Sequence, residues 1–183
     1  QARVQAVRDR IAAACRSAGR APGSVRLIAV SQTFPAESVR AAAHAGQRDF
    51  GENYVQEGVA KITELRAAGL DLAWHFIGPL QSNKTRAVAQ DFQWVHSVER
   101  EKIAERLSAQ RDAHAGPLDV CIQVNVSGES SKSGVAPAEV GALARVVAGL
   151  PRLKLRGLMA VPEPTLDQTL QRRRFAQLRE MGI

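Results

Sequence analysis

Apolar stretches as long as β-strands alternate with amphipathic helical stretches along this sequence of 183 residues. Strand-like segments occur at residues 25–31, 48–52, 73–78, 93–98, 118–126 and 154–161. Each is followed by a helical segment, at residues 35–45, 54–68, 83–90, 99–111, 137–149 and 168–180. One more amphipathic helix precedes them, with an apolar face formed by Val4, Val7, Ile11, Ala14, Cys15 and Ala18. Because parallel neighbouring strands need a crossover helix, this order predicts a parallel sheet covered by helices.

Two architectures have this order of elements. An open, doubly wound sheet usually carries a glycine-rich turn after its first strand. Here the turn reads Ser31-Gln32-Thr33-Phe34-Pro35 and contains no glycine. The sequence therefore favours an α/β fold of the (β/α)8 TIM-barrel type, of which about six βα units are evident. We expect a single barrel domain over residues 1–183, in which the seventh and eighth strands of the barrel are not evident.

Composition excludes several classes of protein. The net charge is +7, but the 25 basic residues are dispersed among 18 acidic ones, and the aromatic residues are only five Phe, two Trp and one Tyr. No basic and aromatic residues interleave in a way that stacks bases, so we expect no nucleic-acid partner. No apolar run approaches the ~18 residues of a membrane helix, and no charged segment followed by an apolar one opens the sequence, so we expect neither a membrane span nor a signal peptide. Cys15 and Cys121 lack metal or redox spacing, which predicts buried reduced thiols in a cytoplasmic protein.

In barrels of this type, functional side chains collect at the carboxyl ends of the strands. The polar residues at those positions are Ser31, Gln32, Glu52, Asn53, His75, His96, Ser97, Asn125 and Ser127. Several have structural alternatives: Asn53 as a helix N-cap, His75 as a core histidine bonded to a backbone carbonyl, and Glu52 as the partner of a nearby Arg or Lys. No metal site is indicated, because His75 and His96 have no ligand at suitable spacing.

Two polar loops follow predicted strands. Residues 79–84 carry several hydrogen-bond donors just before a helix, as in an anion site or a structural cap. Residues 127–134 surround Lys132 with hydroxyl groups and glycines. This second loop lacks the spacing of a Walker motif, and a solvated surface turn is the alternative interpretation.

Several long segments, in the same order, resemble the pyridoxal phosphate homeostasis protein family, single-domain barrels similar to the N-terminal domain of alanine racemase. They are Leu27–Ser31, Asp49–Glu57, Trp74–Lys84, Gln123–Val126 with Ser131–Gly134, and Leu155–Ala160. The resemblance implies a fold-type III barrel that holds pyridoxal 5′-phosphate (PLP) through a lysine at the end of the first strand. It also implies phosphate-binding residues from strands seven and eight, near a Gly-Met-Ser segment and a Gly-Thr pair that are not recognisable here.

In this sequence the position of the PLP lysine is Gln32. A glutamine amide nitrogen is delocalised and cannot form a Schiff base, so we expect PLP to bind non-covalently at best. Lys84 and Lys132 are the strand-end lysines available as substitutes. The other residues expected at a cofactor site are Asn53, His75, Ser97, Asn125, Lys132 and Met159.

The resemblance implies a non-catalytic PLP-binding protein of PLP homeostasis. A racemase-like PLP enzyme is the first alternative, but it needs an imine and usually a second base from an additional domain. A cofactor-free barrel that acts through its surface is another. An enzyme unrelated to PLP is a further one, although no paired carboxylates, metal cluster or nucleophile and base support it. We expect a monomer whose small-molecule partner is PLP, and a dimer remains open.

Overall fold

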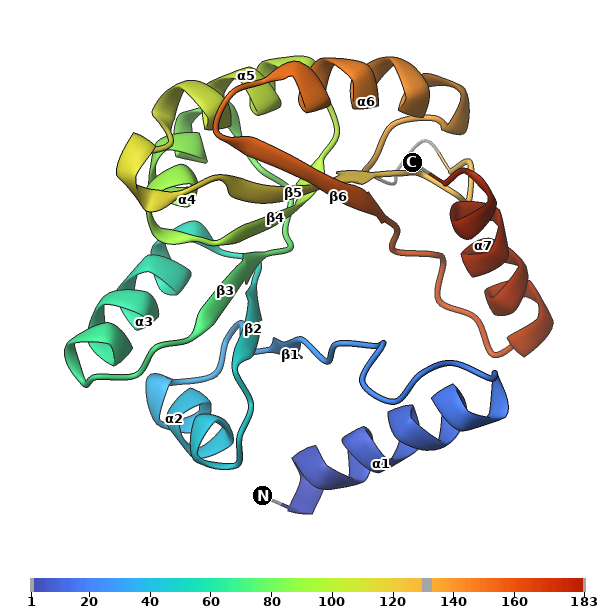
Figure 1. The fold of residues 1–183 in the computed structure, drawn as a ribbon, viewed down its shortest axis with the longest axis horizontal. Helices are drawn as coiled ribbons and strands as arrows, with labels where there is room; N and C mark the ends of the chain where they lie inside the picture. Colours follow the sequence, from blue (N-terminus) through green and yellow to red (C-terminus); the bar gives the residue numbers. More distant parts are fainter. Residues whose placement is uncertain (1, 130–132, 183) are drawn as a thin grey trace. The chain divides into compact units, whose positions relative to one another are not determined.

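The computed structural model describes residues 2–129 and 133–182. The chain divides into two compact units, residues 1–75 and 76–183, and the division falls inside the third strand (Figure 1). In both units, strands and helices alternate along the chain. The α/β prediction is therefore confirmed.

The first unit contains three parallel strands in sequence order, with the second between the other two. Its elements are α1 (Ala2–Ser17), β1 (Ala29–Val30), α2 (Ala36–His44), β2 (Asp49–Glu52), α3 (Val55–Ala67) and β3 (Ala73–Phe76). Apolar side chains from β2 and β3 meet the helices, and the rings of Phe50 and Trp74 lie 5.8 Å apart. The core includes Val39, Ala43, Phe50, Ile62, Leu65 and Trp74.

The strand β1 is shorter than its apolar sequence predicts, because only Ala29 and Val30 pair with β2. The chain just before it is held by a side chain instead. Gln47 is buried, and its Nε2 donates hydrogen bonds of 2.7 Å to the carbonyl oxygens of Leu27 and Asp49. An amide side chain thus makes the link that a longer strand would make through its backbone.

The second unit contains three more parallel strands in sequence order. Its elements are η1 (Ser82–Lys84), α4 (Thr85–Asp91), β4 (Trp94–Val98), α5 (Glu101–Gln110), η2 (Ala113–Ala115), β5 (Leu118–Gln123), η3 (Pro137–Glu139), α6 (Val140–Gly149), β6 (Leu153–Met159) and α7 (Gln168–Glu180). Alternate residues of β5, Leu118, Val120 and Ile122, are fully buried. Figure 1 shows α4, α5 and α6 along one side of these strands.

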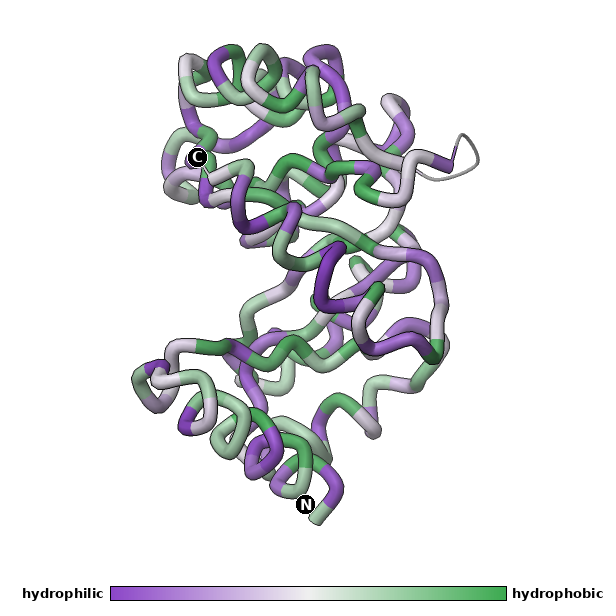
Figure 2. Tube along the Cα trace, turned by 90° about the vertical axis from the view of Figure 1, so that its right-hand side faces the viewer, coloured by the Kyte–Doolittle hydropathy of each residue, from purple (hydrophilic) through white to green (hydrophobic). Residues whose placement is uncertain are grey.

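The helices have the two-sided character that their sequences predict. Along them, the colours of Figure 2 change between hydrophilic and hydrophobic every few residues. None of the helices within residues 2–129 and 133–182 combines the length and the apolar character of a membrane span.

Cys15 and Cys121 are buried and free, as predicted. Burial raises the pKa of the Cys121 thiol to about 11, and the nearby Asp119 carboxylate acts in the same direction. This thiol is therefore protonated and unreactive at neutral pH.

The pairings of β4 with β5 and of β5 with β6 are irregular. The pairing of β4 with β5 shifts between Val95 and Val98, and the pairing of β5 with β6 shifts between Val120 and Cys121. Bulges of this kind turn side chains away from strict alternation and are common beside functional sites. The shift between Val95 and Val98 spans His96 and Ser97.

A buried arginine ties α4 to the turn after α5. Arg111 is 6% exposed, and its guanidinium donates to the carbonyl oxygens of Ala89, Phe92, Ala115 and Gly116 at 2.7 to 3.2 Å. Burial lowers the pKa of Arg111, because the charged form of the guanidinium loses part of its hydration. Its hydrogen bonds to carbonyl groups offset that cost.

We expect Arg111→Met to destabilise the chain by roughly 1 to 3 kcal/mol, because the buried carbonyl groups of Ala89 and Phe92 lose their donor. Urea unfolding followed by circular dichroism measures the loss. The exposed Arg145 on α6 provides the matched control, Arg145→Met. Equal unfolding midpoints for the two variants would contradict the role given to Arg111.

Candidate functional site

Gln32 lies in a tight turn directly after β1. The amide of Phe34 donates to the carbonyl oxygen of Ser31 at 3.1 Å, which closes the turn. Thr33 has a φ of 65°, in the left-handed region that β-branched residues rarely occupy. Gln32 itself is half-buried. The chain therefore reverses sharply at this position.

A buried group of charged side chains lies beside the turn. Lys61 of α3 places its Nζ 2.9 Å from Oε1 of Glu52 and 2.6 Å from Oε1 of Glu57. The Lys61 side chain is 7% exposed, Glu52 is 0% exposed and Glu57 is 31% exposed. We call Lys61, Glu52 and Glu57 the Lys61 cluster.

The Lys61 cluster holds the residues on both sides of Gln32. The Nζ of Lys61 donates to the carbonyl oxygen of Ser31 at 2.6 Å, and the Ser31 hydroxyl donates to Glu52 at 2.6 Å. On the other side, the amide of Thr33 donates to Glu57 at 2.6 Å. The geometry of the turn is thus set by side chains from β2 and α3.

These contacts define the chemical state of Lys61. A lysine ammonium has three N–H donors, and all three are used, by Ser31, Glu52 and Glu57. The nitrogen is then protonated and has no lone pair with which to attack a carbonyl group. Lys61 is therefore a fixed cation and not a substitute for a nucleophilic lysine at position 32.

The importance of Lys61 was missed from sequence, although two signals point to it. It lies four residues after Glu57, the spacing of an ion pair on a helix. It also lies on the buried face of α3, with Val55, Gly58, Ile62 and Leu65. For Glu52, the predicted pairing with a nearby basic residue is confirmed.

Two other candidates of the first unit lie on or next to β2 and β3. His75 is 1% exposed, and its Nε2 is 3.0 Å from Oδ1 of Asp49, at the beginning of β2. Asn53 follows the opposite end of β2 and is half-buried. The N-cap alternative for Asn53 is wrong, because α3 begins at Val55 and its N-cap residue is Tyr54.

In the second unit, Asn125 organises the loop that follows β5. Its Oδ1 accepts hydrogen bonds from the Ser127 hydroxyl at 3.2 Å and from the Gly128 amide at 3.0 Å. Its Nδ2 donates to the carbonyl oxygen of Glu129 at 2.7 Å. The described contacts of Asn125 are thus with its own loop.

The far side of the same loop packs against the end of β5. The amide of Gly134 donates to Glu99 at 2.9 Å, and the Nε2 of Gln123 lies 3.4 Å from the carbonyl oxygen of Ser133. A Cβ on Gly134 would lie 2.7 Å from the Asn125 nitrogen, and its φ is 115°, so only glycine fits. Both described ends of the loop are anchored, whereas Lys132 lies outside the described residues.

Ser97 lies near the carboxyl end of β4 and Met159 is the last residue of β6, the strands on either side of β5. Ser97 is 2% exposed, and its hydroxyl has no hydrogen-bond partner among the described residues. Met159 pairs with Gln123, and its carbonyl oxygen accepts from the Val124 amide at 2.8 Å. Met159 is thereby brought next to the strand that leads into Asn125, and Ser97 offers an unused polar group.

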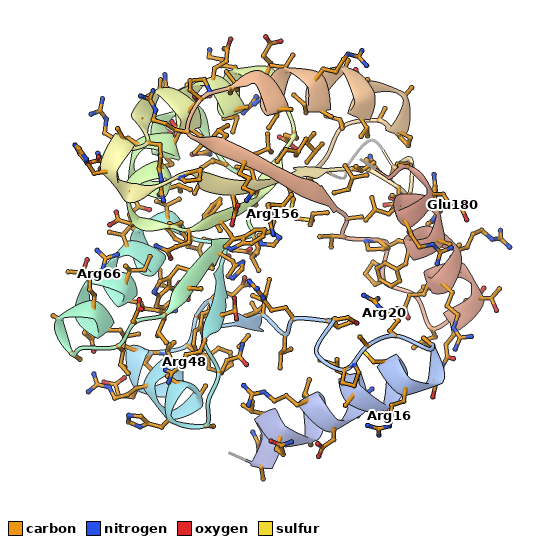
Figure 3. All side chains as sticks on the ribbon, in the orientation of Figure 1. Arg16, Arg20, Arg48, Arg66, Arg156 and Glu180 are labelled. Carbon is orange, nitrogen blue, oxygen red and sulfur yellow. The ribbon has the colours of Figure 1, made fainter. Side chains whose placement is uncertain are left out.

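Aromatic and cationic groups stack on β4 and β6. The Trp94 and His96 rings are stacked with their centroids 5.6 Å apart. Arg156, labelled in Figure 3, places its guanidinium 5.6 Å from the centroid of the Trp94 ring. Its Nε is 3.9 Å from the Asp119 carboxylate. This stack gives His96 a packing partner within its own strand.

The described residues do not suit covalent attachment of an aldehyde cofactor at the end of β1. Position 32 carries an amide, and the amine beside it, Lys61, is fully hydrogen-bonded as a cation. Lys84, one of the two lysines expected as substitutes, is the last residue of η1 in the second unit. In the second unit, the Ser97 hydroxyl has no hydrogen-bond partner among the described residues and is free to bind a polar group.

The acidity of Glu57 yields a pH prediction. The hydrogen bond from Lys61, followed by that from the Thr33 amide, lowers the pKa of Glu57 below its ordinary 4.5, although burial opposes the shift. Because the folded pKa is the lower one, the stabilisation is complete above about pH 4.5 and is lost as the pH falls through the folded pKa.

We expect Glu57→Gln to be less stable than the parent chain at neutral pH, and the difference to shrink below about pH 4.5. Urea unfolding at a series of pH values measures it. A difference that stays constant down to strongly acidic pH would contradict the role of the ionised Glu57.

Residues 4–181 match the family described as alanine racemase, N-terminal domain. The chain is 61% identical over 175 residues to the pyridoxal phosphate homeostasis protein of Pseudomonas aeruginosa, an overlap of 96% of this chain and 75% of that protein. It is 53% identical over 178 residues to the protein of the same name from Escherichia coli K12, covering 97% of this chain and 75% of the relative.

Solved structures agree with these matches. The structure of PipY from Synechococcus elongatus, described with PLP bound, has a TM-score of 0.80 and 39% identity, and the overlap covers 96% of this chain and 79% of that one. Alanine racemase from Corynebacterium glutamicum has a TM-score of 0.65 at 16% identity, covering 87% of this chain and 45% of that chain. The latter likeness shows the fold alone. Together with the alternating parallel strands and helices, it confirms the predicted α/β fold of the TIM-barrel type.

Proposed function

We propose that this chain, which belongs to the pyridoxal phosphate homeostasis protein family, binds PLP without a covalent bond and acts in PLP homeostasis rather than as a racemase. The names of the relatives from P. aeruginosa and E. coli support the homeostasis role, and the PLP-bound PipY structure supports the ligand. The observation that carries the non-covalent part is Gln32, at the position where the family resemblance implies a lysine.

The absence of an amine at position 32 separates binding from catalysis. PLP enzymes use an imine between cofactor and amine as their electron sink. Gln32 cannot form that imine, and Lys61 has no free electron pair while it donates to three acceptors. Chemistry of the racemase type therefore has no support in the residues that the structure describes.

Binding without an imine would rest on hydrogen bonds and contacts from the strand ends. We assign such roles to Asn53 and to Ser97, whose buried hydroxyl has no partner among the described residues. Met159 would supply an apolar contact. The remaining candidates, His75, Asn125 and Lys132, complete the proposed set; for His75 and Asn125 the described partners are Asp49 and the 127–129 loop.

The two free, buried cysteines support a cytoplasmic location, which we also propose. Thiols that lie in separate apolar segments and form no disulfide are the usual state in a reducing compartment.

We expect PLP to bind saturably in equilibrium dialysis and to give no imine absorption band in the visible spectrum. We expect Gln32→Lys to produce such a band, abolished by borohydride, and to bind PLP at least about tenfold more tightly, equivalent to ~1.4 kcal/mol. The reason is that a covalent bond would be added to contacts that already exist.

The matched control is Gln56→Lys, which adds a lysine at an exposed position of α3. It should leave the spectrum and the affinity unchanged. A borohydride-sensitive band from the chain with Gln32 would refute non-covalent binding. Dialysis without saturation would favour a cofactor-free barrel that acts through its surface.

A further inference from the structure

The Lys61 cluster places charged groups where their burial is costly, and the proposed binding contacts do not account for it. It contains two carboxylates and one ammonium, and Lys61 and Glu52 are 7% and 0% exposed. Buried ion groups of this kind are often no more stable than apolar residues of the same volume, so stability alone does not explain them. Their contacts show another use, since they converge on the turn that carries residue 32.

We infer that Lys61, Glu57 and Glu52 are positioning residues, which fix the turn so that the side chain at position 32 is held toward the ligand. This inference rests on the proposed function, because it assumes that residue 32 faces bound PLP. None of the three residues is assigned a contact with the ligand. They act through the backbone on either side of residue 32.

The hydrogen bonds divide the task among the three side chains. Lys61 fixes the carbonyl of Ser31 at 2.6 Å, and Glu52 fixes the hydroxyl of Ser31 at 2.6 Å. Glu57 fixes the amide of Thr33 at 2.6 Å. Residue 32 lies between two anchored neighbours, so its Cα has little freedom to move.

The conformation of Thr33 shows why an external anchor is needed. Its φ of 65° is unfavourable for a β-branched residue and persists only where surrounding contacts impose it. Besides the turn bond between Phe34 and Ser31, the described contact at this point is the Thr33 amide to Glu57. Removing the Glu57 carboxylate should release Thr33 toward an ordinary backbone conformation.

The choice of a lysine at position 61 also has a chemical consequence. Because its three donors are all occupied, Lys61 stays cationic and does not compete for an aldehyde. A lysine placed at position 32 would therefore be the reactive amine of the pair. In the Gln32→Lys variant, Lys61 would thus position the turn, and the lysine at position 32 would react with the aldehyde.

Glu57→Ala tests the inference with two independent measurements. The first is hydrogen exchange of the Thr33 amide without ligand, which we expect to become at least about tenfold faster as the hydrogen bond is lost. The second is imine formation with PLP in the Gln32→Lys background, which we expect to fall at least about tenfold in affinity. Glu57→Gln retains an acceptor oxygen and should restore most of the Thr33 protection.

Glu64→Ala is the matched control on the same helix. Glu64 pairs with Arg40 at 3.5 Å and its side chain is 54% exposed, so this variant removes an ion pair without touching the turn. Because Lys61→Met leaves two carboxylates without their cation, it is combined with Glu52→Gln and Glu57→Gln to keep the protein folded. This triple variant should lose imine formation in the Gln32→Lys background, while its far-ultraviolet circular dichroism stays that of the parent.

The outcomes separate the two proposals. Equal Thr33 exchange in Glu57→Ala and Glu64→Ala would overturn the positioning role, and so would faster exchange with unchanged imine formation. If Gln32→Lys forms no imine at all, the proposed function fails at position 32. Faster exchange in Glu57→Ala would then still support the anchoring of the turn.

Discussion

The hydrogen bonds of the Lys61 ammonium group are the contacts on which the arrangement of the first unit depends. It joins the end of β2, the first turn of α3 and the backbone after β1 through three hydrogen bonds of 2.6 to 2.9 Å. Each partner needs the others. Without the cation, the buried Glu52 and the partly exposed Glu57 would lose their shared partner, and without the carboxylates a buried ammonium would be unpaired. The strained turn at Thr33 depends on the same group of contacts.

That arrangement fixes the backbone on both sides of position 32. The turn is sharply bent, and the residues on both sides of the half-buried Gln32 are anchored by hydrogen bonds. In the function that we propose, the amide at this strand tip leaves hydrogen bonding, without a covalent bond, as the means of holding the ligand. In the second unit, Asn125 and Gly134 anchor a polar loop at the end of β5 in a comparable way.

Sequence reasoning predicted the elements well and the contacts poorly. Apolar periodicity located the strands and helices to within a few residues, because burial of one face is a local property of the sequence. It overestimated β1, since pairing depends on a partner strand, and the Gln47 side chain replaces that pairing before Ala29. It also treated Lys61 as an ordinary helix residue, because the carboxylates that pair with it come partly from another element.

The same distinction, between properties of the sequence and contacts made on folding, applies to the candidate site. By itself, the sequence determined the α/β class, the family and the amide at position 32, because each depends on the order and identity of residues. Only the tertiary structure decided that Lys61 is a buried cation, that His75 pairs with Asp49, and that Tyr54 rather than Asn53 caps α3. Those facts depend on which groups meet once the backbone has folded, and hydrogen bonds act over distances of about 3 Å that residue order does not reveal.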